Sequence, residues 1–219
     1  MNPRNPRKPL LAVLLFSFIF LLNSCFGVNA GIVLNQNGSG IVTLEYRVSK
    51  AMDSLGRLDG NERWNTIPVG KADFERTLAR LPDMKLVSFS SSEDERNLIC
   101  TAKMEFTNLN GLLAFLDAGG SRSSLTGDAQ SGRMVLGFGG GQGIKNAGLD
   151  KLLASVSEGY TVKMSMTFPA EGSLALTDHE GKPLQSGGDI VAKGKTVSFS
   201  LPLYEILSSP GGINAEFGW

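Results

Sequence analysis

Few side chains in this chain of 219 residues could perform covalent or metal chemistry. The cysteines are Cys25 and Cys100, and the one histidine is His179. This set is too small for the four His and Cys ligands of a structural zinc site. A catalytic serine would need His179 as its base, but the polar sequence TDHEGK around it predicts an exposed turn. We therefore expect no metal ion, no cofactor and no catalytic residue, and we expect that the protein is not an enzyme.

A glycine-rich stretch, Gly137 to Gly143, raises the question of a phosphate-binding loop because it lies between a predicted strand and a predicted helix. The dinucleotide fingerprint G-x-G-x-x-G fails in every frame, since its third glycine would fall on Gln142, Ile144 or Asn146. The P-loop requires Gly-Lys-Ser/Thr, whereas Ile144 precedes Lys145. We expect this stretch to be a loop that binds no nucleotide.

Cys25 is the most informative of these residues because of what precedes it. Residues 1–9 contain three basic residues and no acid, and residues 10–22 form thirteen consecutive positions without a charge. A basic start followed by a short apolar segment is the layout of a secretory signal. The apolar segment is shorter than the roughly 20 residues of a membrane-spanning helix. The sequence therefore predicts that the chain is exported.

The segment Leu22-Asn23-Ser24-Cys25 resembles the lipobox of bacterial lipoproteins, in which the cysteine thiol is acylated and the chain is cut just before it. The resemblance implies a signal peptide at residues 1–24 and lipid attachment at Cys25, although Asn23 departs from the small apolar residue usual at that place. Each buried acyl CH₂ contributes roughly 0.8 kcal/mol, so two chains hold a protein on a bilayer. The alternatives are an uncleaved anchor and an ordinary signal cut near Ala30.

The charge that remains after such a cut excludes two classes of partner. The chain has 21 basic and 21 acidic residues, and removal of residues 1–24 leaves 18 basic against 21 acidic residues. Nucleic-acid binding usually needs a basic stripe, and binding to anionic lipid by charge needs a polybasic segment. We therefore expect no nucleic-acid partner. The residues left after the cut suit one domain, or one domain with an appended lobe.

Alternation of apolar and polar residues predicts most of the strands. It is clearest along residues 42–48, 160–168 and 197–201, and it is shorter at 134–138. The Asn-Gly pair at residues 37–38 predicts a hairpin that joins residues 32–34 to the strand from Ile41.

A second hairpin is predicted around an acidic loop. Residues 92–97 contain three acids in a row and separate a weak strand pattern near 84–91 from a strong one at 98–107. Cys100 falls on the apolar face of the later strand, so we expect it to be a small core side chain. Pairing of Cys100 with another molecule is the alternative.

Leucine spacing of i, i+3, i+4 and i+7 predicts helices between the strands. The apolar stripes start at Phe74, Leu109 and Leu149, with Pro82 ending the first helix and Asn108 capping the second. This order of elements predicts an α+β fold with an antiparallel, curved sheet and helices packed on one face. We expect a short tether at residues 25–30, the α+β ectodomain at 31–207, and a flexible tail at 208–219.

Two stretches resemble LppM-type lipoprotein ectodomains. The first is the hairpin at residues 31–49, and the second comprises Met166 to Gly172, Ser186 to Gly188 and Lys195 to Ser200. The resemblance covers the outer parts of the domain and implies a curved sheet that contacts lipid or glycolipid, with no enzymatic residues to carry over. A membrane helix near the C-terminus, which that family typically has, finds no counterpart here.

These observations predict a lipoprotein held to a bacterial membrane on its periplasmic or cell-surface side, with an ectodomain that binds lipid or glycolipid. Five residues, 26–30, separate Cys25 from Gly31, so the domain would lie close to the bilayer. The alternative is an interaction protein without enzymatic activity, for which the tryptophan in a polar stretch, Trp64, is a candidate contact. The ligand-binding residues cannot be named from these patterns.

Overall fold

The computed structural model describes residues 27–50, 70–95, 97–117, 122–139, 147–184 and 188–219. Cys25 and Trp64 lie outside these residues. The elements follow one another in the order β1 (Val28–Leu34), β2 (Gly40–Ser49), α3 (Lys71–Leu78), β3 (Met84–Glu93), β4 (Asn97–Phe106), α4 (Leu109–Leu116), β5 (Ser124–Gly127), β6 (Gly132–Phe138), α5 (Ala147–Ser157), β7 (Thr161–Thr167), β8 (Ser173–Asp178), β9 (Asp189–Lys193), β10 (Thr196–Pro202), α6 (Leu203–Ser208) and β11 (Ile213–Gly218).

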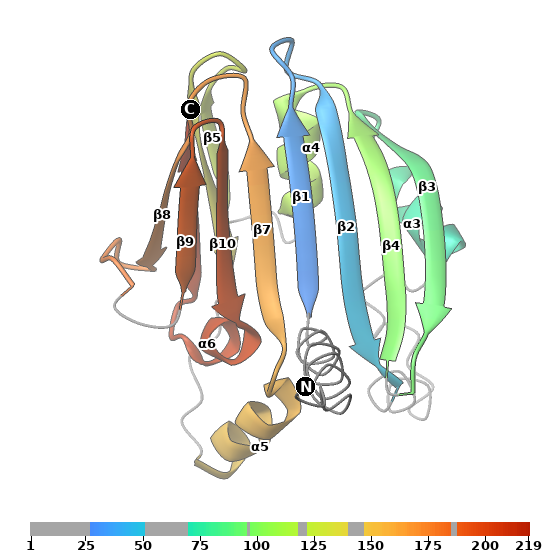
Figure 1. Ribbon diagram of the computed structural model, residues 1–219, viewed down its shortest axis with the longest axis vertical. Coiled ribbons are helices and arrows are strands. Elements are labelled where there is room, and N and C mark those ends of the chain that lie inside the picture. Colours follow the sequence, from blue (N-terminus) through green and yellow to red (C-terminus); the bar gives the residue numbers. More distant parts are fainter. Residues whose placement is uncertain (1–26, 51–69, 96, 118–121, 140–146, 185–187) are drawn as a thin grey trace, which may run out of the picture.

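Within the described residues, seven strands form a large sheet in the order β3-β4-β2-β1-β7-β10-β9 (Figure 1). Both predicted hairpins are present, since β1 pairs with β2 and β3 pairs with β4, each antiparallel. The sheet is mostly antiparallel, as predicted, and departs from this at one place, where β1 and β7 are parallel neighbours. Parallel neighbours need a long connection, and everything from β2 to α5 supplies it here.

Four further strands form a second sheet in the order β5-β6-β11-β8, with antiparallel pairs throughout. The predicted flexible tail at 208–219 is therefore wrong, because it contains β11, which lies between β6 and β8. Ile213, Ala215 and Phe217 point into the core, and Phe217 is 0% exposed. The predicted tether is shorter than expected as well, because β1 already begins at Val28.

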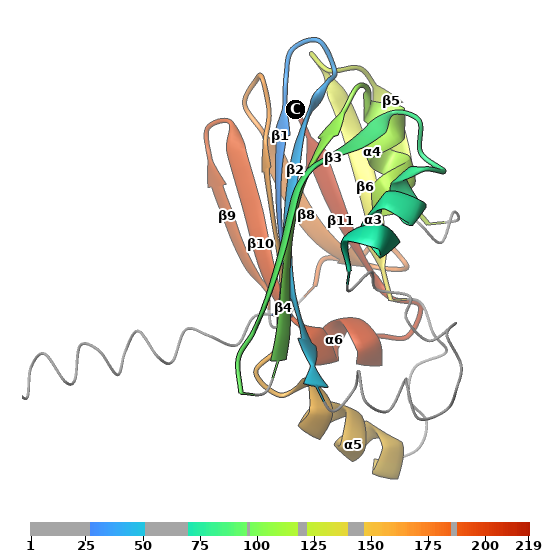
Figure 2. The same cartoon turned by 90° about the vertical axis from the view of Figure 1, so that its right-hand side faces the viewer.

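The second sheet and helices α3 and α4 lie on the same side of the large sheet (Figure 2). The apolar faces of both sheets meet there and form the hydrophobic core, to which β4, β7, β10 and β11 contribute alternate residues. The α+β class and the placing of helices on one face are thus confirmed. The single predicted sheet becomes two, because β8 and β11 pair with β6 and β5 to form a separate layer.

Local sequence explains where the helices begin. Asn108 caps α4 as predicted, since its side-chain oxygen accepts a hydrogen bond of 2.9 Å from the backbone N–H of Gly111. At the start of α3, the carboxylate of Asp73 accepts one of 3.2 Å from the backbone N–H of Gly70. Phe74 and Leu78 are the buried residues of α3, and they anchor it over the sheet.

Candidate functional site

A partly enclosed cavity of about 220 Å³ lies between the large sheet, the C-terminal end of α4 and the end of β6. Its walls are mostly apolar. They consist of Val28, Ala30, Leu44, Phe115, Leu116, Leu136, Gly137, Phe138, Val162, Lys163 and Met164. The sequence named none of these residues as ligand-binding, and a lipid-contacting sheet was implied only by the family resemblance.

The floor of the cavity comes from three neighbouring strands of the large sheet. Ala30 of β1 lies opposite Leu44 of β2 on one side and opposite Met164 of β7 on the other. Val28 pairs with Val162 in the same way. Period-two alternation puts all five side chains on the covered face of the sheet. The cavity is therefore at the end of the sheet where β1 begins, which is the lower end in Figure 1.

The opposite wall comes from α4 and β6. Phe115 and Leu116 are half-buried residues in the last turn of α4. Phe138, at the end of β6, packs edge-on against Phe199 with ring centroids 5.7 Å apart. The guanidinium of Arg122 donates hydrogen bonds to the carbonyl oxygens of Phe138 and Gly139, which fixes the end of β6 beside the cavity.

The chemistry that such walls allow is apolar binding. Binding to such a surface contributes roughly 25 cal/mol of free energy for each Å² of apolar area that is removed from water. The lining residues include one with an ionisable side chain, Lys163, but alternation along β7 directs that side chain to the face opposite the buried Val162 and Met164. The cavity thus fits hydrocarbon far better than a polar metabolite.

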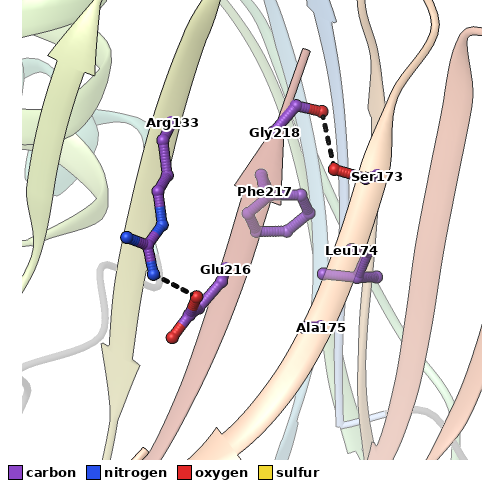
Figure 3. Close-up of a pocket in the computed structure, with 7 residues that line it drawn as sticks. All are labelled: Arg133, Ser173, Leu174, Ala175, Glu216, Phe217 and Gly218. Atoms are coloured by element: carbon purple, nitrogen blue, oxygen red, sulfur yellow. Dashed lines mark hydrogen bonds and ion pairs between the residues drawn. The ribbon is translucent and has the colours of Figure 1, made fainter.

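A second depression, of about 240 Å³, lies on the outer face of the second sheet (Figure 3). Arg133 of β6 donates a charge-assisted hydrogen bond to Glu216 of β11. The hydroxyl of Ser173 on β8 donates a neutral hydrogen bond of 3.4 Å to the carbonyl oxygen of Gly218. Gly218 lines this depression and pairs with Arg133 on one side and with Ser173 on the other. Its polar groups are already engaged with one another, so it is the weaker candidate.

The residues singled out from the sequence do not meet in one site. His179 lies in an exposed turn after β8, as predicted. Cys100 is fully buried on β4 and forms no disulfide, so its prediction as a core side chain is confirmed. The glycine stretch is described only as far as Gly139, whose φ of +70° suits glycine.

The described residues contain no group of three or more His, Cys, Asp or Glu side chains placed to hold a metal ion. In the same part of the chain, no helix combines the length and apolar character needed to cross a bilayer.

Comparison with known proteins adds one likeness. No model of a known protein family matches the chain, and no curated protein matches it. Among solved structures, the folded domain of LppM from Mycobacterium tuberculosis, determined by NMR, is similar over 87% of this chain and 86% of that one. The sequence identity is 16% and the TM-score is 0.41. The structure so found belongs to the family that the sequence motifs resemble.

Proposed function

We propose that the protein is an exported lipoprotein, anchored to a membrane through Cys25, whose ectodomain holds part of a lipid or glycolipid in the apolar cavity. The observation that carries the proposal is the position of the cavity. It is lined by the covered faces of β1, β2 and β7 at the end of the sheet where β1 begins.

The short distance along the chain between Cys25 and the cavity supports this proposal. Val28 lines the cavity and lies three residues after Cys25. Three extended residues span at most about 11 Å. An acylated Cys25 would therefore hold the cavity next to the bilayer surface, where lipid is the most abundant apolar ligand.

The size of the cavity suggests which part of a lipid it takes. Pockets that enclose a whole small molecule measure roughly 300–1,000 Å³, and this one has about 220 Å³. It would accommodate the end of one acyl chain, with the head group and any sugars outside. Affinity would then depend on chain length more than on the head group.

The alternative, a protein-interaction lipoprotein, predicts an exposed apolar patch without an internal cavity. The cavity favours lipid binding over it, and the candidate contact Trp64 lies outside the described residues. If no lipid enters the domain, the protein-interaction alternative replaces lipid binding as the proposed function.

The test of ligand binding uses residues 26–219 produced without the leader. Native mass spectrometry should detect one bound fatty acid or phospholipid per chain, either co-purified or taken up from added palmitate. Leu116→Trp should fill the cavity and lower palmitate uptake at least tenfold. Leu113→Trp is the matched control, because Leu113 is also half-buried on α4 but does not line the cavity. Absence of lipid from the unsubstituted protein, before and after supply, would rule the proposal out.

The anchor needs a separate test in a bacterial host. Cells expressing the full chain should incorporate radioactive palmitate into it, and Cys25→Ser should abolish both the label and recovery in the membrane fraction. A Cys25→Ser protein that matures normally and still sediments with membranes would show that the tether is something else. Lipid uptake by the ectodomain would then have to be judged without the proximity argument.

A further inference from the structure

Strand β9 forms one edge of the large sheet, and no strand of the described residues is hydrogen-bonded to its outer side. It pairs with β10 along its whole length and is the last strand in the order of the sheet. All five of its residues are exposed, including Ile190 at 45% and Val191 at 46%. Exposed main-chain donors and acceptors on such an edge can pair with a further strand.

The other three sheet edges are blunted. Strand β3, at the far side of the large sheet, has an irregular register between Leu86 and Ser88, and bulges of this kind disfavour pairing. In the second sheet, β5 has only four residues. The edge of β8 is partly occupied by the bridge from Thr177 to Pro183 and by the hydrogen bond from Leu184 N–H to the carbonyl of Leu176. Strand β9 differs from all of these in combining a regular register over five consecutive pairs with the exposure of every one of its residues.

The charges of β9 are complementary to those of a second, reversed β9. Its sequence is Asp-Ile-Val-Ala-Lys, with Asp189 at one end and Lys193 at the other. Antiparallel pairing centred on Val191 places Asp189 of each copy opposite Lys193 of the other. Parallel pairing in register would place like charges opposite each other, which is unfavourable.

The main chain fits the same register. A two-residue turn, Gly194 and Lys195, closes the hairpin on the pair Lys193 and Thr196. Main-chain groups alternate in direction along an antiparallel strand, so those of Ile190 and Ala192 point away from β10. The register centred on Val191 brings Ile190 of each copy opposite Ala192 of the other, where these groups can bond. Asp189, Val191 and Lys193 then occupy the pairs whose side chains approach most closely.

We propose that β9 is a self-association site, at which a second copy of this chain adds its own β9 in antiparallel fashion around Val191. The contact is isologous, so it closes as a dimer and does not propagate. It joins the two large sheets into one continuous sheet and covers Ile190. Charged residues on an edge strand can also prevent it from pairing with another strand. The experiment distinguishes self-association from this protective role.

The experiment is disulfide trapping in the full chain carrying Cys25→Ser, purified in detergent. Two Val191 residues would face each other as a non-hydrogen-bonded pair, about 4.5 Å apart at Cα, and a disulfide accepts Cα separations of 4.4–6.8 Å. Val191→Cys should therefore form a covalent dimer on mild oxidation. Val33→Cys is the matched control, because Val33 is equally exposed, at 45%, on the same face of the sheet but lies on β1.

Charge reversal tests the register. In the Val191→Cys chain, Asp189→Lys puts a lysine opposite Lys193 at both ends of the interface. This repulsion should slow disulfide formation about tenfold. The exchange Asp189→Lys with Lys193→Asp restores both attractions and should restore trapping. Equal trapping of Val191→Cys and Val33→Cys would overturn the proposal, as would an Asp189→Lys chain that traps as fast as its parent. Failure of the exchanged pair to recover would overturn it too.

Discussion

Tyr46 and Cys100 lie directly opposite each other on β2 and β4, both buried on the covered face of the large sheet. Phe74 of α3 covers the tyrosine ring, with centroids 6.3 Å apart. By standard hydrogen-bond geometry the buried hydroxyl of Tyr46 has no partner, and its polar neighbour is the Cys100 thiol across the strand pair. Since sulfur is a weak hydrogen-bonding group, this contact compensates little for burial of the hydroxyl.

Tyr46→Phe should leave the free energy of unfolding unchanged or raise it by up to about 1 kcal/mol, because it removes a buried hydroxyl whose polar neighbour is only the weakly hydrogen-bonding Cys100 thiol. Tyr160→Phe is the control, since the Tyr160 hydroxyl donates a 3.0 Å hydrogen bond to the side chain of Asn97. That variant should lose about 1 kcal/mol. Urea denaturation measures both, and a loss for Tyr46→Phe as large as that for Tyr160→Phe would contradict the expectation.

Stability should fall at alkaline pH. Burial raises the pKa of Tyr46, and the neighbouring Cys100 and Asp73 act in the same direction. Burial also raises the pKa of Cys100, partly offset by the Tyr46 hydroxyl. The unfolded chain, with ordinary pKa values near 9.0 for the thiol and 10.0 for the phenol, releases these protons first. The two groups therefore contribute full stability below about pH 9 and lose it as the pH rises.

Denaturation at pH 8, 9, 10 and 11 tests this pH dependence. The free energy of unfolding should decline more steeply above pH 9 in the unsubstituted protein than in Tyr46→Phe, which cannot ionise at that position. Cys100→Ala should likewise flatten the curve, beginning at lower pH. Curves of equal slope in all three proteins would show that other groups control the alkaline limit.

The last strand should be essential to folding. Phe217 is fully buried and packs near Phe168 and Phe199, at centroid distances of 6.5 and 6.4 Å. Phe217→Ala should cost about 3–5 kcal/mol. Glu216→Ala, on the outer face of the same strand, removes an exposed ion pair with Arg133 and should cost at most about 1 kcal/mol. Thermal melts compare the two variants, and a mild effect at Phe217 would favour the tail that the sequence predicts.

Two glycines of the first hairpin should respond in opposite ways to alanine. A Cβ at Gly40 would clash with the carbonyl oxygen of Val33 and with the ring of Phe106, so Gly40→Ala should destabilise by about 3 kcal/mol. A Cβ at Gly31 would be 3.7 Å from the Ser165 hydroxyl, an ordinary contact. Gly31→Ala should stabilise by roughly 0.5–1 kcal/mol. Equal effects in urea denaturation would show that the hairpin packs differently.

The sequence predicted those parts of the fold in which a local pattern and the final packing agree. Alternation along 98–106 predicted both the strand β4 and the burial of Cys100. The Asn-Gly pair predicted the first hairpin, and Asn108 predicted the start of α4. Each of these depends on neighbouring residues and on one buried face, which a single sequence displays directly.

The features that the sequence missed depend on distant pairing. The residues of β11 alternate as clearly as others, with Ile213, Ala215 and Phe217 buried, but the Pro-Gly-Gly before them suggested an irregular end. That alternation was the signal that could have identified the strand. The parallel pairing of β1 with β7 joins Val28 to Val162, and no local pattern encodes it. The cavity walls could not be named for the same reason, since they combine α4 and β6 with strands far away in the chain.

The direction of β9 restricts where two anchored copies could associate. β1 runs parallel to β7, and β7 and β9 are both antiparallel to β10, so β9 runs the same way as β1. A partner that adds its β9 in the opposite sense is turned end over end. If Cys25 is acylated as proposed, at most about 11 Å of chain separates the lipid from Val28, so copies in one leaflet would be oriented alike and could not form this pair. Copies anchored in two facing leaflets could form it, and their joined sheet would then span the space between the membranes.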